Sequence, residues 1–303
     1  MDLPLLFSGT SNQLLTQRVA EVLCWNLGSV EITRFIDNEC RVRIITEARG
    51  KHVFVLQSLS QIADQHLVEL CLMGQAARSI GASRVTAVIP WMGYSKQDKE
   101  FRKGEAVSAL LMAKFIEIAG FDTVITVELH SESLVPFFHV PVVELTTHEL
   151  LSDALQKETP LTNMLVVSPD RGGQSRSTRF AKSVGLSTVY LEKERDLVTG
   201  DVKVVYASHS VKSRGIIIFD DIINTGSTAI VASEFLKDHG AERIFFLATH
   251  PVLAGNASVA LSNSPIDKVI VADTIYVPPE KISSKMTIVS VAPLLADAIR
   301  KAV

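Results

Sequence analysis

The segment GIIIFDDIINTGST, residues 215–228, is the most informative stretch of the 303-residue chain. Its apolar first half predicts a buried strand over residues 215–219, which runs directly into Asp220 and Asp221. The turn at residues 225–228 predicts the start of a helix. A strand, a polar loop and a helix in this order are typical of open α/β folds, which bind ligands at the carboxyl ends of their strands.

The polar loop has the composition of a binding site for a phosphorylated sugar. Backbone amides and hydroxyls at a helix N-terminus suit a phosphate group. Two adjacent carboxylates would repel that phosphate, so Asp220 and Asp221 suit sugar hydroxyls or Mg²⁺ instead. The simpler alternative is an acidic turn with a Ser/Thr helix cap, but a cap does not require two acids after a buried strand. The candidate phosphate ligands are Thr225, Gly226, Ser227 and Thr228.

Short apolar runs alternate with helical patterns along most of the chain, which predicts an α/β fold with mainly parallel sheets flanked by helices. The segment 12–24 predicts an amphipathic helix capped by Ser11 or Asn12, and the last segment of the chain predicts another. The other predicted buried strands cover residues 51–57, 84–90, 123–127, 164–168, 188–191, 243–247 and 268–271.

The two halves of the chain also resemble each other. GASRVTAVIP and GAERIFFLAT, RVAEVL and RFAKSV, and KHVFVLQ and RGIIIFD occur in the same order, each pair about 160 residues apart. The alternative is that all α/β proteins share such patterns. We predict two duplicated domains, residues 1–145 and 146–289, with residues 290–303 as a helix that packs back on the N-terminal domain.

Composition excludes several classes of protein. Lys plus Arg is 30 and Asp plus Glu is 33, and this net charge of −3 argues against a generic nucleic-acid binder. No apolar run approaches the ~20 residues of a membrane span, and the N-terminus lacks a secretory signature. Three widely spaced cysteines form neither a disulfide framework nor a metal cluster, which favours the reducing cytoplasm.

Further polar segments carry weaker signals on their own. Phe35, Asp37 and Glu39 would share one side of a strand or extended loop, where a ring and two acids suit adenine, although solvated acids on an edge strand are commoner. The cationic segment 94–103 suits a triphosphate or is a solvated loop. His130 follows a strand, where a structural role is the commoner one.

Together these segments are similar to the ribose-phosphate pyrophosphokinase (phosphoribosyl pyrophosphate, PRPP, synthetase) family. The loop at 215–228 alone resembles phosphoribosyltransferases as well. The combination is more specific, because five other segments also resemble that family. They are TRFIDNECRVRI from Thr33, GYSKQDKEFRKGEAVSA from Gly93, VELHSES from Val127, VVSPDRGG from Val166 and LEKER from Leu191.

The resemblance implies two phosphoribosyltransferase-type domains, ATP and ribose 5-phosphate as substrates, Mg²⁺ as cofactor, and a homo-oligomer built from dimers, such as a hexamer. It implies that Mg²⁺ is bound by His130 and Asp170, and that Lys193, Arg195 and His130 are catalytic. It implies no nucleic-acid or membrane partner. ATP contacts would come from Phe35, Asp37, Glu39, Lys96, Gln97 and Asp98, and ribose 5-phosphate contacts from Asp220, Asp221, Asn224, Thr225, Gly226, Ser227 and Thr228.

Several positions depart from the family pattern. Lys96 stands where Arg is usual, Glu128 and Asn224 stand where Asp is usual, and Val143–Glu144 replaces an Asp-Asn pair. The last change and the early end of the chain predict weak allosteric inhibition by ADP. Two alternatives to the synthetase follow: a catalytically silent relative that only binds these ligands, and a phosphoribosyltransferase that consumes PRPP.

Overall fold

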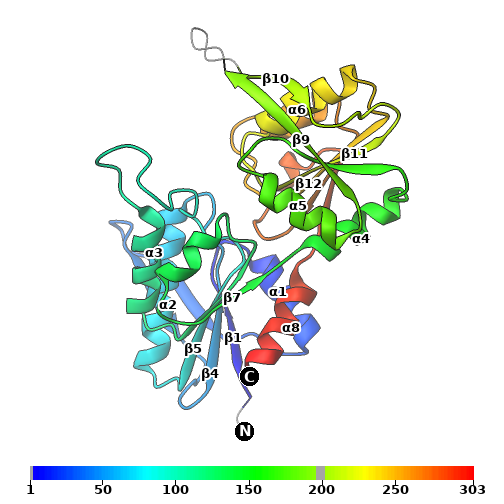
Figure 1. Ribbon diagram of the computed structural model, residues 1–303. Coiled ribbons are helices and arrows are strands. Elements are labelled where there is room, and N and C mark those ends of the chain that lie inside the picture. The colour runs from blue at the N-terminus through cyan, green and yellow to red at the C-terminus, as the bar shows by residue number, and fades with distance from the viewer. Residues whose placement is uncertain (1–2, 196–201) are drawn as a thin grey trace. The chain divides into compact units, whose positions relative to one another are not determined.

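The computed structural model describes residues 3–195 and 202–303, which divide into two compact units (Figure 1). Unit 1 comprises Met1–Thr146, Thr274–Tyr276 and Ser290–Val303. Unit 2 comprises Thr147–Asp273 and Val277–Val289. The final helix of the sequence therefore belongs to unit 1.

Unit 1 is a five-stranded parallel sheet with helices around it. Its strand order is β1-β4-β5-β6-β7, and a separate antiparallel hairpin is formed by β2 and β3. The strands are β1 (Leu5–Ser8), β2 (Val30–Arg34), β3 (Cys40–Ile44), β4 (His52–Leu56), β5 (Arg84–Ile89), β6 (Thr123–Val127) and β7 (Val142–Leu145). The helices are α1 (Gln13–Leu23), α2 (Ala63–Ser79), α3 (Ser108–Ile118), the 3₁₀ helix η1 (Glu132–Phe137) and α8 (Ala292–Ala302).

Unit 2 is a seven-stranded sheet with the order β10-β9-β8-β11-β12-β13-β14, in which only β10 is antiparallel to its neighbour. Its strands are β8 (Met164–Ser168), β9 (Ser187–Arg195), β10 (Val202–Ala207), β11 (Gly215–Ile223), β12 (Arg243–Pro251), β13 (Lys268–Ala272) and β14 (Met286–Val289). Its helices are α4 (His148–Glu158), α5 (Gln174–Ser183), α6 (Ser227–Asp238), α7 (Ala257–Asn263) and the 3₁₀ helix η2 (Pro279–Lys281).

The two sheets repeat one topology. The order β1-β4-β5-β6-β7 of unit 1 matches β8-β11-β12-β13-β14 of unit 2, and every neighbouring pair in both series is parallel. In each unit an antiparallel hairpin follows the first helix of the series: β2–β3 after α1, and β9–β10 after α5. In unit 2 this hairpin extends the sheet through β9, whereas in unit 1 it forms a sheet of its own. The predicted α/β fold class is confirmed.

Strand β11 is buried on both faces, which explains its continuous apolar sequence. Ile216 and Ile218 pack in the cluster that includes residues of α6 and α7. Ile217 and Phe219 pack in the opposite cluster, which includes residues of α4 and α5. Because neighbouring side chains of a strand point to opposite faces, a strand covered by helices on both sides is apolar at every position. The position of β11 is thereby fixed between two helical layers.

The predicted helix at residues 12–24 is observed as α1. The side chain of Asn12 accepts a hydrogen bond from the backbone amide of Leu15 at 3.2 Å, as expected of an N-cap. Helix α8 packs beside α1 within unit 1 (red and blue in Figure 1). Arg300 of α8 donates a hydrogen bond to the carbonyl of Val22. Among the described residues, no helix combines the length and apolar character needed to cross a bilayer.

Candidate active site

The acidic pair of the sequence lies near the carboxyl end of β11. The apolar run alone predicted a strand that ends before the two acids. The observed strand continues to Ile223, so Asp220 and Asp221 lie within it. Arg176 of α5 approaches both acids: its Nη1 atom is 2.5 Å from Oδ1 of Asp220 and 3.0 Å from Oδ1 of Asp221. The side chain of Asp221 is only 1% exposed, and those of Arg176 and Asp220 are 12% and 19% exposed.

Burial and charge act in the same direction on Asp220. Burial, together with the neighbouring charge of Asp221, raises the pKa of this carboxyl group to about 7. The positive charge of Arg176 acts against it, while Asp170 contributes a further small increase. The guanidinium of Arg176 therefore limits the rise in the pKa of Asp220.

Asp170 begins the turn between β8 and α5. Its Oδ1 atom accepts the backbone amide of Gly173 at 2.9 Å, and its carbonyl accepts the hydroxyl of Ser168 at 2.8 Å. A Cβ atom at Gly173 would lie 3.3 Å from the Ser168 hydroxyl and 3.5 Å from the Asp170 carboxylate. Glycine therefore keeps this turn open to an approaching ligand.

The turn at residues 225–228 forms the N-terminus of α6. Gly226 has a φ of +76°, a conformation that favours glycine, and a Cβ atom there would lie 3.1 Å from Leu261. The hydroxyls of Thr225 and Ser227 lie 3.0 Å apart and both side chains are exposed. The carbonyl of Asn224 accepts the amide of Ala254 at 2.8 Å, which anchors the turn. Exposed hydroxyls and amides at a helix start suit a phosphate group.

The proposed adenine contacts lie at the tip of the β2–β3 hairpin. Phe35, Asp37 and Glu39 occupy the turn between the two strands, and Asp37 accepts the backbone amide of Glu39 at 3.2 Å. These three residues therefore lie in a turn and not in a strand, and their place on one side of it stays a prediction. All three side chains are exposed.

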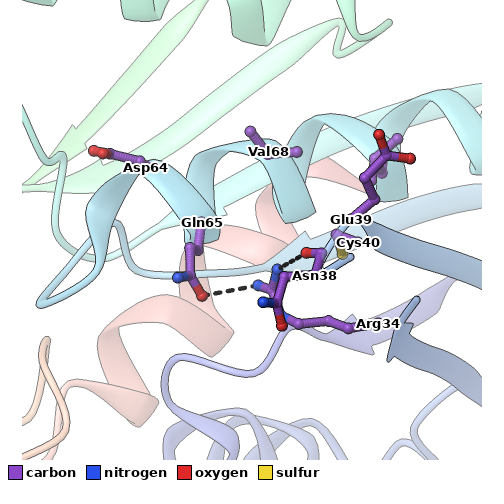
Figure 2. A pocket seen from close by; sticks show the side chains of 8 residues that line it. Arg34, Asn38, Glu39, Cys40, Asp64, Gln65 and Val68 are labelled. Carbon is purple, nitrogen blue, oxygen red and sulfur yellow. Dashed lines mark hydrogen bonds between the residues drawn. The ribbon is translucent and has the colours of Figure 1, made fainter. Parts of the chain in front are cut away.

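A pocket of about 440 Å³ opens between this hairpin and α2 (Figure 2). Arg34 crosses it, donating to the carbonyl of Asn38 at 2.8 Å and to the side chain of Gln65 at 2.9 Å. Glu39 lines the pocket, whereas Phe35 and Asp37 are not among its lining residues. The hairpin tip therefore offers a recess with a partly apolar lining, which includes one of the three predicted adenine contacts.

The cationic segment 94–103 is attached to its surroundings through two of its three candidate ATP contacts. Gln97 accepts the hydroxyl of Ser108 at 2.6 Å, and Asp98 accepts that of Ser133 at 2.8 Å. Partial burial alone would raise the pKa of Asp98, but hydrogen bonds, including that from Ser133, hold it below its usual range. Lys96 is exposed.

His130 is half-buried and follows β6, as predicted. It belongs to unit 1, whereas Asp170 belongs to unit 2. The backbone of β9 is described through Arg195, but the side chains of Lys193 and Arg195 lie outside the described residues.

A Mg²⁺ ion fits the candidate ligands only if waters or substrate phosphates complete its coordination. Within residues 3–195 and 202–303, His, Cys, Asp and Glu side chains form no group of three or more placed to hold a metal ion. Asp170 offers the hard carboxylate oxygen that Mg²⁺ prefers. Because Mg²⁺ keeps several waters and commonly binds through substrate phosphates, one or two protein ligands are compatible with it.

Arg176 is the site residue that the sequence did not reveal. It lies inside an ordinary-looking helix, three residues after Gly173, and makes its contacts with a strand more than 40 residues further along the chain. Its sequence signal is the spacing Asp170-x-x-Gly173-x-x-Arg176, which places an arginine in the first turn of the helix after the glycine turn.

Two duplicated parallel sheets, with an acidic strand end followed by a phosphate-type helix start, define a two-domain α/β protein of the phosphoribosyltransferase type. Residues 4–120 match the N-terminal domain of ribose phosphate pyrophosphokinase, and residues 202–303 match the phosphoribosyl synthetase-associated domain. The chain belongs to the ribose-phosphate pyrophosphokinase family.

Full-length relatives agree with this assignment. The chain is 39% identical to ribose-phosphate pyrophosphokinase of Shewanella oneidensis, over 98% of this chain and 94% of the relative. It is 36% identical to that of Ralstonia nicotianae, over 99% and 95%. The crystal structure of phosphoribosylpyrophosphate synthetase from Mycobacterium smegmatis matches with a TM-score of 0.93 and 32% identity, covering 99% of both chains.

Proposed function

We propose that the protein transfers pyrophosphate from MgATP to the C1 hydroxyl of ribose 5-phosphate, giving PRPP and AMP. The observation that carries this proposal is the continuity of the site in unit 2. Asp220 and Asp221 near the end of β11 lead within a few residues to the turn at 225–228, where Thr225 and Ser227 are exposed. This spacing offers sugar hydroxyls and a phosphate group their binding partners on one strand–loop–helix unit.

In the proposed mechanism, the helix start at 225–228 binds the 5-phosphate, and the carboxylates orient the sugar. The C1 hydroxyl oxygen then forms a bond to the β-phosphorus of ATP, the bond to the α-phosphate oxygen breaks, and AMP leaves. Lys193, Arg195 and His130 would stabilise the negative charge on the transferring group. This chemistry depends chiefly on positioning and charge, so a strong general base is not required.

His130 and Asp170 are the proposed ligands of Mg²⁺, which would neutralise phosphate charge when bound. The hairpin tip, together with Lys96, Gln97 and Asp98, is the proposed ATP-binding region. The proposed state is a dimer-based homo-oligomer. The proposed compartment is the cytoplasm, where the free thiols Cys24, Cys40 and Cys71 would stay reduced.

The test measures AMP release from ATP and Mg²⁺ with and without ribose 5-phosphate, together with the PRPP formed. The proposal expects AMP and PRPP in equal amounts, and only when ribose 5-phosphate is present. Calorimetric binding of both ligands without AMP release would favour the silent relative. Turnover of PRPP with a nucleobase would favour the transferase that consumes it.

A further inference from the structure

Helix α5 is attached to the end of β11 by three contacts from one face. Phe180 stacks on Phe219, with ring centroids 4.2 Å apart and planes 5° from parallel. The hydroxyl of Ser177 donates to the carbonyl of Phe219 at 3.1 Å. Arg176 contacts the two residues that follow, Asp220 and Asp221. The first two contacts hold α5 against β11, so they also fix the position of Arg176 relative to the two acids.

The arginine contact is unusual because one nitrogen atom serves two carboxylates. Asp220 and Asp221 are neighbours on a strand, so the pleat would direct them to opposite faces. The Nη1 atom of Arg176 nevertheless lies within 3.0 Å of an oxygen of each. The amide of Asp221 also donates to Oδ1 of Asp220 at 3.0 Å. One oxygen of each acid is therefore turned inward, toward the guanidinium.

An arginine that is only 12% exposed also offsets the local excess of negative charge. Asp221 is almost fully buried, and two carboxylates this close repel each other when both are ionised. Arg cannot lose its proton in a protein, so its charge is permanent. Removing it would leave two acids close together in a poorly solvated site, where they would turn apart or take up a proton.

Helix α5 also starts at the Asp170 turn. The carboxylate of Asp170 receives the amide of Gly173, and α5 begins at the next residue. One helical turn therefore joins the proposed Mg²⁺ ligand to the residue that holds the proposed sugar ligands. A shift of Arg176 would change the sugar end of the site without a direct contact to ATP.

We propose that Arg176 is a positioning residue for ribose 5-phosphate: its Nη1 atom lies against one oxygen each of Asp220 and the buried Asp221, and so orients the partly exposed carboxylate of Asp220 toward the sugar hydroxyls. The inference rests on the proposed function and adds to it a residue that touches neither the reacting atoms nor ATP. The simpler alternative is an ion pair that only stabilises unit 2.

The test compares steady-state kinetics of Arg176→Met and Arg176→Lys with the wild-type protein. Because the truncation leaves a charged pair without its buried partner, we expect Arg176→Met to raise KM for ribose 5-phosphate by about 10- to 100-fold. The KM for ATP should change less than about 3-fold. Since a single nitrogen makes both contacts, the lysine ammonium should restore most of the affinity. Arg179→Met, an exposed arginine of the same helix, is the matched control.

A folded Arg176→Met protein with an unchanged KM for ribose 5-phosphate would overturn the positioning role. So would an equal rise in both KM values, which indicates general damage to the site. If Arg176→Met does not unfold cooperatively, the test uses Arg176→Lys instead. This variant should fold and should raise only the KM for ribose 5-phosphate, by a few fold. An equal rise in the KM for ATP would contradict the proposal. Absence of turnover in the wild-type protein is a different result. It counts against the proposed function, and calorimetric titration of ribose 5-phosphate into the same variants then decides the role of Arg176.

Discussion

The carboxyl ends of β4 and β11 occupy the same place in the two repeated sheets, but their chemistry is opposite. The aligned runs KHVFVLQ and RGIIIFD end at Gln57 and Asp220, so a neutral amide in unit 1 corresponds to an acid in unit 2. The acidic residue near this strand end in unit 1 is Glu69 of α2. Its side chain is 2% exposed and accepts hydrogen bonds from Thr10 and Gln57. In unit 2 two acids surround an arginine.

The difference separates a structural polar network in unit 1 from the proposed binding site in unit 2. Glu69 accepts the amide of Thr10 at 2.7 Å, its hydroxyl at 2.8 Å and the side chain of Gln57 at 2.6 Å, so neutral donors satisfy it inside the protein. Asp220 keeps 19% of its side chain exposed beside the turn at 225–228. A shared fold therefore does not imply a shared function. The polar residues at each strand end determine whether that end can bind a ligand.

The largest expected effect tests the polar network around Glu69 at the end of β4 in unit 1. Glu69→Ala leaves the buried side-chain amide of Gln57 without its acceptor and removes both hydrogen bonds to Thr10, so we expect the free energy of unfolding to fall by about 3 kcal/mol. Urea unfolding measures this change. Gln75→Ala, on the exposed side of the same helix, is the control and should cost less than about 0.5 kcal/mol. A selective loss of ribose 5-phosphate affinity in folded Glu69→Ala would show that unit 1 has a binding site here too.

The next effect tests the partly exposed acid Asp220 at the end of β11 in unit 2. Asp220→Asn removes a charged acceptor but preserves shape, so kcat/KM for ribose 5-phosphate should fall by about 30-fold, or about 2 kcal/mol. ATP affinity should be unchanged in calorimetry. Asp238→Asn, at the exposed end of α6, serves as the control and should match the wild-type protein. Full activity of Asp220→Asn would remove the sugar-binding role of the acidic pair.

A smaller change is expected at Asn224, which is exposed beside the phosphate turn. Asn224→Asp adds a charged acceptor, and charged acceptors form stronger hydrogen bonds than amides, so KM for ribose 5-phosphate should fall by about 3-fold. Steady-state kinetics at saturating ATP measure it. A raised KM would mean that repulsion of the 5-phosphate outweighs any contact with a sugar hydroxyl.

The pH dependence of stability offers a comparable test in unit 1. Burial lowers the pKa of His52 to about 4, and Arg84 acts in the same direction. The unfolded chain takes up a proton near pH 6.5 that the folded chain does not, so this contribution to stability is present above pH 6.5 and is lost as the pH falls toward 4. Allowing for partial exposure, the loss between pH 7.5 and 5 is about 1 kcal/mol.

Urea unfolding of the wild-type protein and of His52→Gln at both pH values isolates this contribution. The variant should lose less stability on acidification, and an equal loss would exclude His52 as the cause. The aligned residue of unit 2 is Gly215, which has no side chain to titrate.

The smallest effect concerns ADP. Glu144 accepts the backbone amide of Leu129 at 2.8 Å, so its carboxylate holds the segment beside His130. We expect ADP to inhibit by competing with ATP, with no second saturable site, as the replacement of the Asp-Asn pair by Val143 and Glu144 predicts. Inhibition kinetics at several ATP concentrations test this. Strong non-competitive inhibition would contradict it.

Buried parallel strands were predictable because both of their faces are covered. The runs at Thr123–Val127 and Met164–Ser168 coincide with β6 and β8. The short strands β1, β7 and β14 were not predicted, since each has only four residues and depends on its neighbours in the sheet. Strands β11 and β12 run past their apolar cores, because hydrogen bonds between them continue to Ile223 and Pro251.

The sequence pointed to candidate site residues only where they are consecutive. Asp220, Asp221 and the turn at 225–228 follow one another, so a single segment exposes their chemistry. Arg176 comes from another helix, and only the packing of α5 on β11 brings it to the acids. The adenine contacts Phe35, Asp37 and Glu39 stay a prediction, and the turn that holds them depends on the pairing between β2 and β3.

The most direct measurement is a crystal structure of the protein grown with Mg²⁺ and ribose 5-phosphate. The account predicts a sugar whose phosphate lies at residues 225–228 and whose hydroxyls face Asp220 and Asp221, with Arg176 still in contact with both acids. Ribose 5-phosphate bound instead at the end of β4, beside Thr10 and Gln57, would contradict it.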